Sequence, residues 1–254
     1  MTVEVEDREN GVRIIRLAGA SASKSFSRES MPIIARAIDD GLSKQSVRAL
    51  IITGEGKFFS AGADIHAFQE AIDADDAPQL IRDLTNILHP LLVRMRQSAT
   101  IVVGAINGAA AGGGLGLALA CDVRIGSPKA KLAASYASMG LSPDGGTTWL
   151  LPRLVGEQRS RTFFFENQIW SAEQALNAGA LDEVVEADEL INRSIEVATN
   201  WSKWGNHFRE ATKHLLHVQS QNDFETHLKH EQTLIEAAGT TSEFKEGVSK
   251  FLGN

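Results

Sequence analysis

A buried strand that runs straight into a glycine-rich turn and an apolar helix constrains the fold more than any other feature of this sequence. The strand is TIVVGAIN, residues 100–107, and the turn and helix follow in GAAAGGGLGLALACD, residues 108–122. The composition of the first run is typical of a buried strand, and a strand that leads into a helix is the repeating unit of an alternating α/β core. This stretch therefore predicts an α/β domain.

The remainder of the chain supports an alternating α/β core followed by a helical tail. We expect a hairpin of strands 3–7 and 12–17, because Asn10-Gly11 between them is a strong tight-turn pair. Further strands are predicted at 47–54, 123–127, 130–135 and 181–186, and helices after 27, over 80–95, after 171 and from 187 onward. The acidic stretch at 66–79 is expected to be a mobile surface segment. These elements predict a core domain over 1–190 and a helical C-terminal region over 191–254.

Composition excludes several classes of function. The chain has 254 residues, 43% of them hydrophobic and 22% charged, as in an ordinary globular protein. Its formal net charge of −7 argues against a nucleic-acid partner. The single cysteine, Cys121, rules out an internal disulfide and fits a reducing compartment. Without a signal-peptide pattern or a long apolar run, we expect a cytoplasmic protein with no membrane partner.

The glycine-rich stretches do not match nucleotide-binding motifs. The stretch GEGKFF lacks the serine or threonine and the first glycine of a P-loop, and GAAAGGGLG does not give the dinucleotide spacing. Two interpretations of Gly112–Gly114 stay open, namely tight strand-to-helix packing and exposed N–H groups that bind an anion or oxyanion. The histidine pairs His214/His217 and His227/His230 have no third ligand at a familiar spacing, so no metal site is predicted.

Asp144 stands between a proline and two glycines in LSPDGGTTWLLPR, residues 141–153. Pro-Asp-Gly is strong turn chemistry, so a turn alone accounts for the residue. A second interpretation involves the glycine-containing loops at 60–65 and 108–116. Two backbone N–H groups from these loops would hold a carbonyl oxygen, and a nearby carboxylate would act as general base on the adjacent carbon.

Four stretches, in this order along nearly the whole chain, resemble the crotonase (enoyl-CoA hydratase/isomerase) superfamily. They are GEGKFFSAGADI, INGAAAGGGLGLALACDVRI, GLSPDGGTTWLLPRLVG and SAEQALNAGALDEVV. The resemblance implies the crotonase (ClpP-like) α/β fold of repeated ββα units, with a helical C-terminal trimerisation region and a homotrimer or dimer of trimers. It also implies an acyl-CoA thioester substrate, with coenzyme A as part of the substrate and no separate cofactor.

The resemblance also assigns roles to residues. It implies that the backbone N–H groups of Ala63 and Gly113 are the oxyanion donors. It further implies that Lys24 and the stretch Ala61–Ile65, including Asp64 and Ile65, line the path of the coenzyme.

The departures from the family pattern are informative. Family hydratases carry two glutamates that activate water, and the matching positions here hold Gly116 and Tyr136. Asp144 falls where other members have a catalytic aspartate, and its surroundings resemble the ring-epoxide isomerase and 3-enoyl-CoA isomerase branches. We expect an apolar pocket formed with Leu141, Trp149 and Leu150, in which a carboxylate becomes a stronger base.

The sequence therefore predicts an acyl-CoA isomerase with Asp144 as the acid and base. Tyr136 and Ser142 are expected to shape the pocket or to hydrogen-bond the acid. Two alternatives stay open. One is a hydratase that recruits a carboxylate such as Glu70 or Asp73, and the other is a non-catalytic acyl-CoA-binding relative.

Overall fold

The computed structural model describes residues 2–253 and consists of two sheets surrounded by helices. The strands are β1 (Thr2–Asp7), β2 (Val12–Ala18), β3 (Ala49–Gly54), β4 (Phe58–Ser60), β5 (Ile101–Ile106), β6 (Ala109–Ala111), β7 (Val123–Gly126), β8 (Lys131–Ala133), β9 (Ile169–Ser171) and β10 (Glu183–Val184). The helices are α1 (Ala20–Ser23), α2 (Ser30–Ser43), α3 (Ile65–Asp73), α4 (Ala77–Gln97), α5 (Gly113–Leu119), α6 (Thr147–Val155), α7 (Glu157–Phe165), α8 (Ala172–Ala178), α9 (Leu190–Ser202), α10 (Asn206–Val218), α11 (Phe224–Ala238) and α12 (Ser242–Phe251). The predicted α/β class with a helical tail is confirmed.

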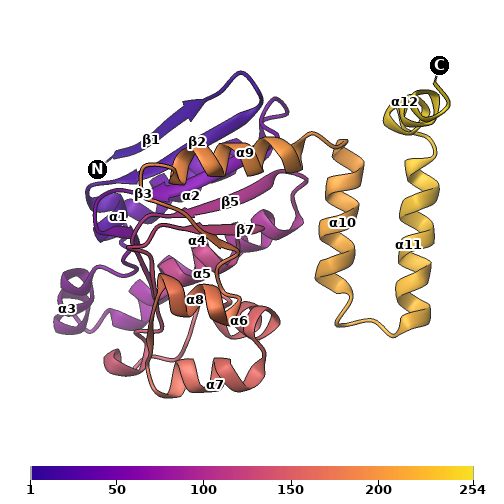
Figure 1. The fold of residues 1–254 in the computed structure, drawn as a ribbon. Coiled ribbons are helices and arrows are strands. Elements are labelled where there is room, and N and C mark those ends of the chain that lie inside the picture. Colours follow the sequence, from indigo (N-terminus) through magenta and orange to yellow (C-terminus); the bar gives the residue numbers. More distant parts are fainter. Residues whose placement is uncertain (1, 254) are drawn as a thin grey trace.

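The larger sheet has the strand order β1-β2-β3-β5-β7-β10. Strands β1 and β2 form the predicted antiparallel hairpin, and every other neighbouring pair is parallel. Successive side chains of a strand point to opposite faces. In β3, Ala49 and Ile51 accordingly pack toward α9, whereas Leu50 and Ile52 join the core on the side of α2 and α4. Helices therefore cover both faces of this sheet (Figure 1).

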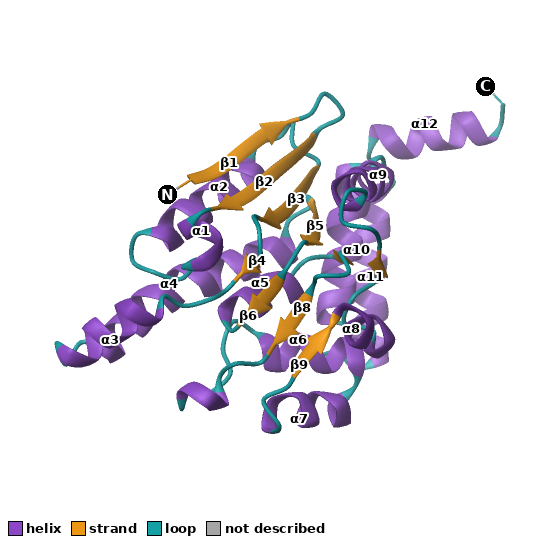
Figure 2. Cartoon of the chain, turned by 60° about the vertical axis from the view of Figure 1, so that its left-hand side comes forward, coloured by secondary structure: helices purple, strands orange, loops and turns teal. Residues whose placement is uncertain are grey.

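The smaller sheet has the order β4-β6-β8-β9 and lies below the larger one (Figure 2). Strands β4, β6 and β8 are parallel neighbours, and β9 is antiparallel to β8. The chain leaves the three parallel strands at the same edge of the sheet. The loops that follow β4, β6 and β8 therefore meet at one place, which is the candidate site described below.

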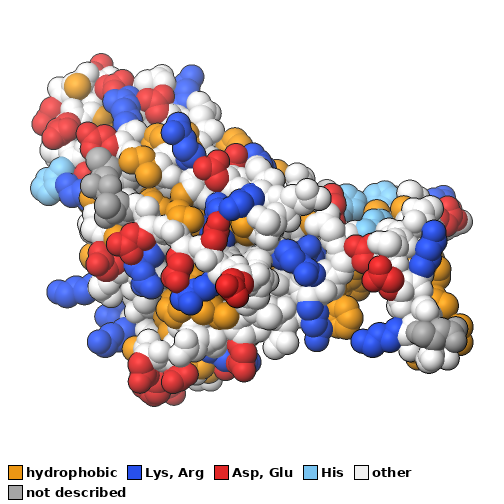
Figure 3. All heavy atoms as spheres, turned by 90° about the horizontal axis from the view of Figure 1, so that it is seen from above, with side chains coloured by type: hydrophobic (Ala, Val, Ile, Leu, Met, Phe, Trp, Pro, Cys, Tyr) orange, Lys and Arg blue, Asp and Glu red, His pale blue; other side chains and the backbone are white. Residues whose placement is uncertain are grey.

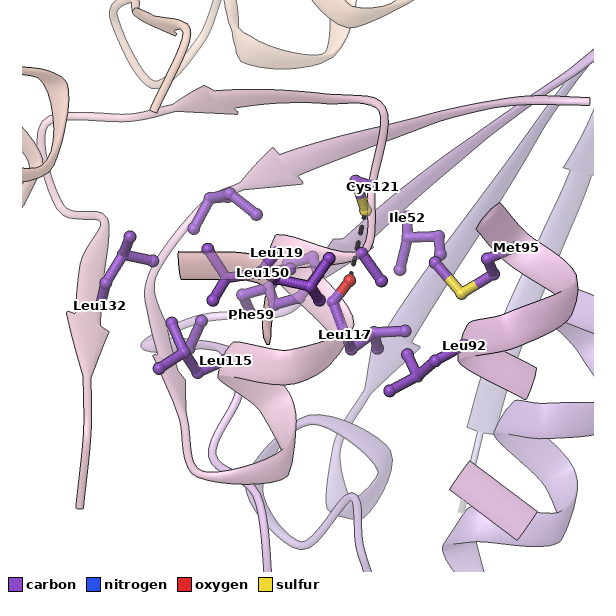
Figure 4. Close-up of a cluster of buried hydrophobic side chains, with 14 of the residues drawn as sticks. Ile52, Phe59, Leu92, Met95, Leu115, Leu117, Leu119, Cys121, Leu132 and Leu150 are labelled. Atoms are coloured by element: carbon purple, nitrogen blue, oxygen red, sulfur yellow. Dashed lines mark hydrogen bonds between the residues drawn. The ribbon is translucent and has the colours of Figure 1, made fainter. Parts of the chain in front are cut away.

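Helix α5 is anchored in the main core. Its side chains Leu115, Leu117 and Leu119 are almost fully buried, together with Phe59 of β4 (Figure 4). The buried thiol of Cys121 donates a hydrogen bond to the Leu117 carbonyl at 3.4 Å, and burial raises the pKa of this thiol to about 12. Such a thiol is unreactive at neutral pH. The core thus fixes the helix whose N-terminus faces the site.

Helix α9 packs on the larger sheet, α10 packs against α4, and α11 and α12 lie farther from the body (Figure 1). Helices α10–α12 are here called the C-terminal arm. The arm is fastened by Lys213 of α10. Its ammonium group, which is largely buried, pairs with Asp122 at 2.8 Å and donates to the carbonyls of Met95 and Thr100. The predicted domain division at 190/191 falls within the first turn of α9, and the division itself stays a prediction.

Two details differ from the sequence-based expectation. The stretch 66–79 lies mostly at the surface, as expected, but it is mostly helical, in α3 and the start of α4, and its mobility stays a prediction. The Asp64 carboxylate accepts the His66 N–H and caps α3, and Pro78 stands in the first turn of α4. The short strands β4, β6 and β9 were not predicted as such. Among the described helices, none is both long and apolar enough to cross a membrane.

Candidate active site

Two backbone N–H groups lie near each other where the chain leaves β4 and β6. Ala63 forms a parallel bridge with Phe26, in which the Phe26 N–H donates to Gly62 and the Asp64 N–H donates to Phe26. In a parallel bridge these two bonds flank Ala63, so its own N–H points to the opposite side. The Gly113 N–H is the first of α5 and has no helical acceptor. Neither N–H has an acceptor among residues 2–253.

Close packing brings the two donors together. A Cβ on Gly62 would lie 3.6 Å from the Gly113 nitrogen and 2.5 Å from the Ala111 carbonyl oxygen. The Phe26 ring also packs on Gly113, since a Cβ there would lie 3.1 Å from it. Phe26 therefore holds Ala63 through its backbone and Gly113 through its ring, a role that the sequence analysis missed. The arrangement suits two N–H donors for one oxyanion.

The turn that carries Asp144 lies directly over α5. Gly145 and Gly146 have φ values of 62° and 69°, which glycine adopts without strain. A Cβ on Gly145 would lie 3.4 Å from the Gly116 Cα and 3.7 Å from the Gly113 Cα. Asp144, the preceding residue, is thereby held next to the N-terminus of α5.

The backbone of Asp144 is fixed by side chains from two elements. The hydroxyl groups of Tyr136 and Thr147 each donate to the Asp144 carbonyl oxygen at 2.9 Å. Burial raises the pKa of Tyr136 to about 12, so this hydroxyl keeps its proton at neutral pH and remains a donor. Tyr136 thus contacts the backbone of the aspartate and not its carboxylate. Ser142 is exposed in the same turn, and within residues 2–253 it makes no hydrogen bond with Asp144.

The Asp144 carboxylate contacts His89, a residue that the sequence analysis did not identify. The Nε2 atom of His89, on α4, lies 2.6 Å from Asp144 Oδ1, and both side chains are partly exposed. The expected apolar pocket around Asp144 is therefore not found, because the carboxylate is partly exposed and paired with a polar side chain. Leu150 is buried and Trp149 half-buried, but Leu141 is exposed and the polar contact comes from α4.

The residues expected along the coenzyme path also lie together. Lys24 pairs with Asp64 at 3.1 Å, and the Ala61 N–H donates to the Ala22 carbonyl at 2.8 Å. Burial alone would raise the pKa of Asp64, but hydrogen bonds from Lys24 and the His66 N–H outweigh it and lower the pKa. Ile65 is half exposed at the start of α3. The Lys24 side chain is partly exposed, whereas the Asp64 side chain with which it pairs is largely buried.

Glu70 and Asp73, the alternative carboxylates, are exposed on α3. Asp73 accepts a hydrogen bond from Gln69 on the same helix. No contact in the described part of the chain links either carboxylate to Asp144, Ala63 or Gly113. The described residues also contain no cluster of three or more side chains suited to a metal ion.

Known proteins resemble this chain over nearly its full length. The family model for enoyl-CoA hydratase/isomerase matches residues 7–254. The 1,2-epoxyphenylacetyl-CoA isomerase of Escherichia coli (strain K12) is 30% identical, with 96% of this chain and 93% of the relative covered. The trans-2-decenoyl-(acyl-carrier-protein) isomerase of Streptococcus mutans is 29% identical, with 96% and 92% covered.

A solved structure gives the same fold. The enoyl-CoA hydratase from Bacillus anthracis superimposes with a TM-score of 0.90 at 26% identity, covering 100% of this chain and 96% of that one. The predicted crotonase fold is confirmed by this likeness. With the family model, the relatives and the fold in agreement, the chain belongs to the enoyl-CoA hydratase/isomerase family.

Proposed function

We propose that this protein is an acyl-CoA isomerase that moves a double bond of an unsaturated acyl-CoA into conjugation with the thioester. The observation that carries the proposal is the position of Asp144. Its turn packs on the first residues of α5, beside the free N–H of Gly113, and the hydrogen bonds from Tyr136 and Thr147 go to its carbonyl oxygen and not to its carboxylate. A base next to an oxyanion site is the arrangement that proton transfer at the α carbon of a thioester requires.

The proposed reaction is a proton transfer between two carbons of the substrate. The N–H groups of Ala63 and Gly113 bind the thioester oxygen. Asp144 removes a proton from the α carbon of a 3-enoyl-CoA, and the electrons of the C–H bond move into a dienolate whose oxygen is held by the two donors. The Asp144 acid then returns the proton to the γ carbon, which gives the 2-enoyl-CoA and restores the carboxylate. No water and no separate cofactor takes part.

The positions of the family's hydratase glutamates argue against water addition. Gly116 has no side chain, and a Cβ there would lie 2.4 Å from the Gly145 carbonyl oxygen. The hydroxyl of Tyr136 is protonated at neutral pH and donates its hydrogen bond to the Asp144 carbonyl. A hydratase would therefore need Glu70 or Asp73, which are exposed on α3.

The acyl-CoA substrate class is supported by the family and by relatives named as acting on CoA thioesters. We place the coenzyme along Lys24 and the stretch 61–65, where the partly exposed side chain of Lys24 attracts phosphate. We also propose a homotrimer or a dimer of trimers. Its support is the exposed apolar side chains of the C-terminal arm, which include Phe208, Leu216 and Ile235.

The test supplies the purified protein with a 3-enoyl-CoA and, separately, with a 2-enoyl-CoA. An isomerase generates the ultraviolet absorbance of the conjugated thioester from the first substrate and leaves the second unhydrated. Hydration of the 2-enoyl-CoA that survives the loss of Asp144 would favour the hydratase alternative. Binding of both thioesters without turnover would favour a non-catalytic role.

A further inference from the structure

The two oxygens of the Asp144 carboxylate have different surroundings. Oδ1 lies 2.6 Å from His89 Nε2, whereas Oδ2 has no hydrogen-bond partner among residues 2–253. An ionised carboxylate only accepts hydrogen bonds, so Nε2 must carry the proton in this contact when Asp144 is the base. One oxygen is therefore bound and the other is free.

The part of α4 that carries His89 packs against the turn that carries Asp144. The preceding residue, Leu88, is buried, and its Cδ2 atom would lie 3.5 Å from a Cβ on Gly145. The following residues Leu91 and Leu92 are also buried, so α4 is fixed in the core on both sides of His89. The imidazole thus comes from a helix that is anchored in the core, 55 residues away from the turn in the sequence.

We propose that His89 is a positioning residue that assigns the roles of the two carboxylate oxygens. Its Nε2–H binds Oδ1 and so directs Oδ2 toward the substrate as the proton-accepting oxygen. This inference rests on the proposed function, because only a proton-transferring Asp144 needs a defined orientation. The terminal torsion of an aspartate is broad. In a partly exposed site, a free carboxylate would turn toward water as readily as toward the α and γ carbons.

Three variants of His89 separate positioning from other roles. In His89→Gln the side-chain amide nitrogen reaches about where Nε2 lies and still donates, but it does not titrate. In His89→Asn the amide nitrogen reaches only as far as Nδ1, and in His89→Leu the donor is absent. We expect kcat for 3-enoyl-CoA isomerisation to fall about 10- to 100-fold in the Asn and Leu variants, as for a misplaced catalytic group. KM should stay near the wild-type value, and the Gln variant should recover most of the lost kcat.

Two results would overturn the inference. One is an unchanged kcat in the Leu variant, and the other is an equal loss in the Gln and Leu variants, which would mean that the imidazole itself is required. Because Gln and Asn differ only in reach, their comparison remains informative if the Leu variant folds poorly. Circular dichroism on all three variants checks the fold.

A second measurement keeps this inference separate from the proposed function. Exchange of the C2 protons of a 3-enoyl-CoA with D2O, followed by mass spectrometry, reports proton removal without requiring isomerisation. If the wild type exchanges but does not isomerise, the proposed function fails, and the order Gln above Asn and Leu in exchange rate still supports the role of His89. If the His89→Leu variant exchanges as fast as the wild type, the positioning role fails alone. A wild type that does neither contradicts both.

Discussion

A Cβ on Gly116 would lie 2.4 Å from the carbonyl oxygen of Gly145, so the Asp144 turn occupies the space of any side chain at position 116. The resemblance of the motifs predicts that this position corresponds to a glutamate of the family's hydratases. Because the backbones of Gly116 and Gly145 approach so closely, a glutamate at position 116 and the aspartate turn compete for the same space. In this chain the two arrangements exclude each other sterically.

Substitution of Gly116 should consequently displace Asp144. We expect Gly116→Ala to lower isomerase turnover by about 10- to 100-fold, because the backbone of the turn must move to accommodate the methyl group. Gly116→Glu should lose isomerisation without gaining hydration of a 2-enoyl-CoA. The matched control is Gly247→Ala in α12, where an added Cβ meets no atom within 4 Å. A fully active Gly116→Ala variant would contradict the steric argument.

Tyr136 is the only tyrosine of the chain, so its ionisation can be followed directly by ultraviolet absorbance. Burial raises the pKa of Tyr136 to about 12 from its ordinary value of 10.0. We expect the tyrosinate signal of the folded protein to appear near pH 12 and that of the urea-unfolded protein near pH 10.

The sign of the linked stability change follows from these pKa values. Above pH 10 the unfolded chain loses this proton while the folded chain retains it, so stability should fall as pH rises from 10 to 12. The Tyr136→Phe variant should lack both the signal and this part of the alkaline loss. A folded-state signal near pH 10 would show that the hydroxyl is not buried against the Asp144 carbonyl.

The buried pair Lys213–Asp122 should dominate the attachment of the C-terminal arm. Burial lowers the pKa of Lys213, while Asp122 opposes this shift and keeps the ammonium paired. We expect Lys213→Met to cost roughly 3–5 kcal/mol of unfolding free energy, since it leaves a buried carboxylate unpaired. The exposed pair Lys229–Glu225 is the control, and Lys229→Met should cost no more than about 1 kcal/mol. Equal costs in urea denaturation would contradict the role of the buried pair.

Histidines gather near α10 and α11 (Figure 3), where the rings of His214 and His230 lie 6.1 Å apart. Burial, with further contributions from Arg96, His214 and Arg153, lowers the pKa of His217 below its ordinary value of 6.5. As pH falls below 6.5, the unfolded chain therefore takes up this proton before the folded chain, and stability falls.

An aromatic ring at position 217 that does not titrate tests this pH dependence. His217→Phe retains an aromatic contact with Trp149, whose ring centroid lies 5.1 Å from that of His217. The loss of unfolding free energy between pH 7 and pH 5 should be smaller in this variant than in the wild type. Identical losses would mean that His217 is not responsible.

Much of the fold was predictable because its signals are local. The Asn10-Gly11 turn predicts the hairpin, and the apolar run at 100–107 predicts β5. By contrast, β4 and β6 have three residues each, too few to show a periodic pattern. Helix α3 was obscured by its acidic composition, although Ile65, Phe68 and Ile72 recur at helical spacing.

The candidate site was only partly predictable. The resemblance supplied Ala63, Gly113 and Asp144, which stay predictions as catalytic groups. His89 contacts Asp144 across 55 residues of sequence, and no local pattern marks a histidine in the middle of a helix as a partner of a distant turn. Phe26 was missed for the same reason, because its role depends on tertiary contacts with Gly62 and Gly113.

The most direct test of this account compares the wild type with Asp144→Asn in the conversion of a 3-enoyl-CoA to the conjugated 2-enoyl-CoA. Asparagine retains the size of the side chain and the turn but does not act as a base. We predict a loss of turnover of at least about 100-fold, within the range for removal of a general base, with acyl-CoA binding unchanged by calorimetry. Turnover that persists in Asp144→Asn would contradict it and would reduce Asp144 to a turn residue.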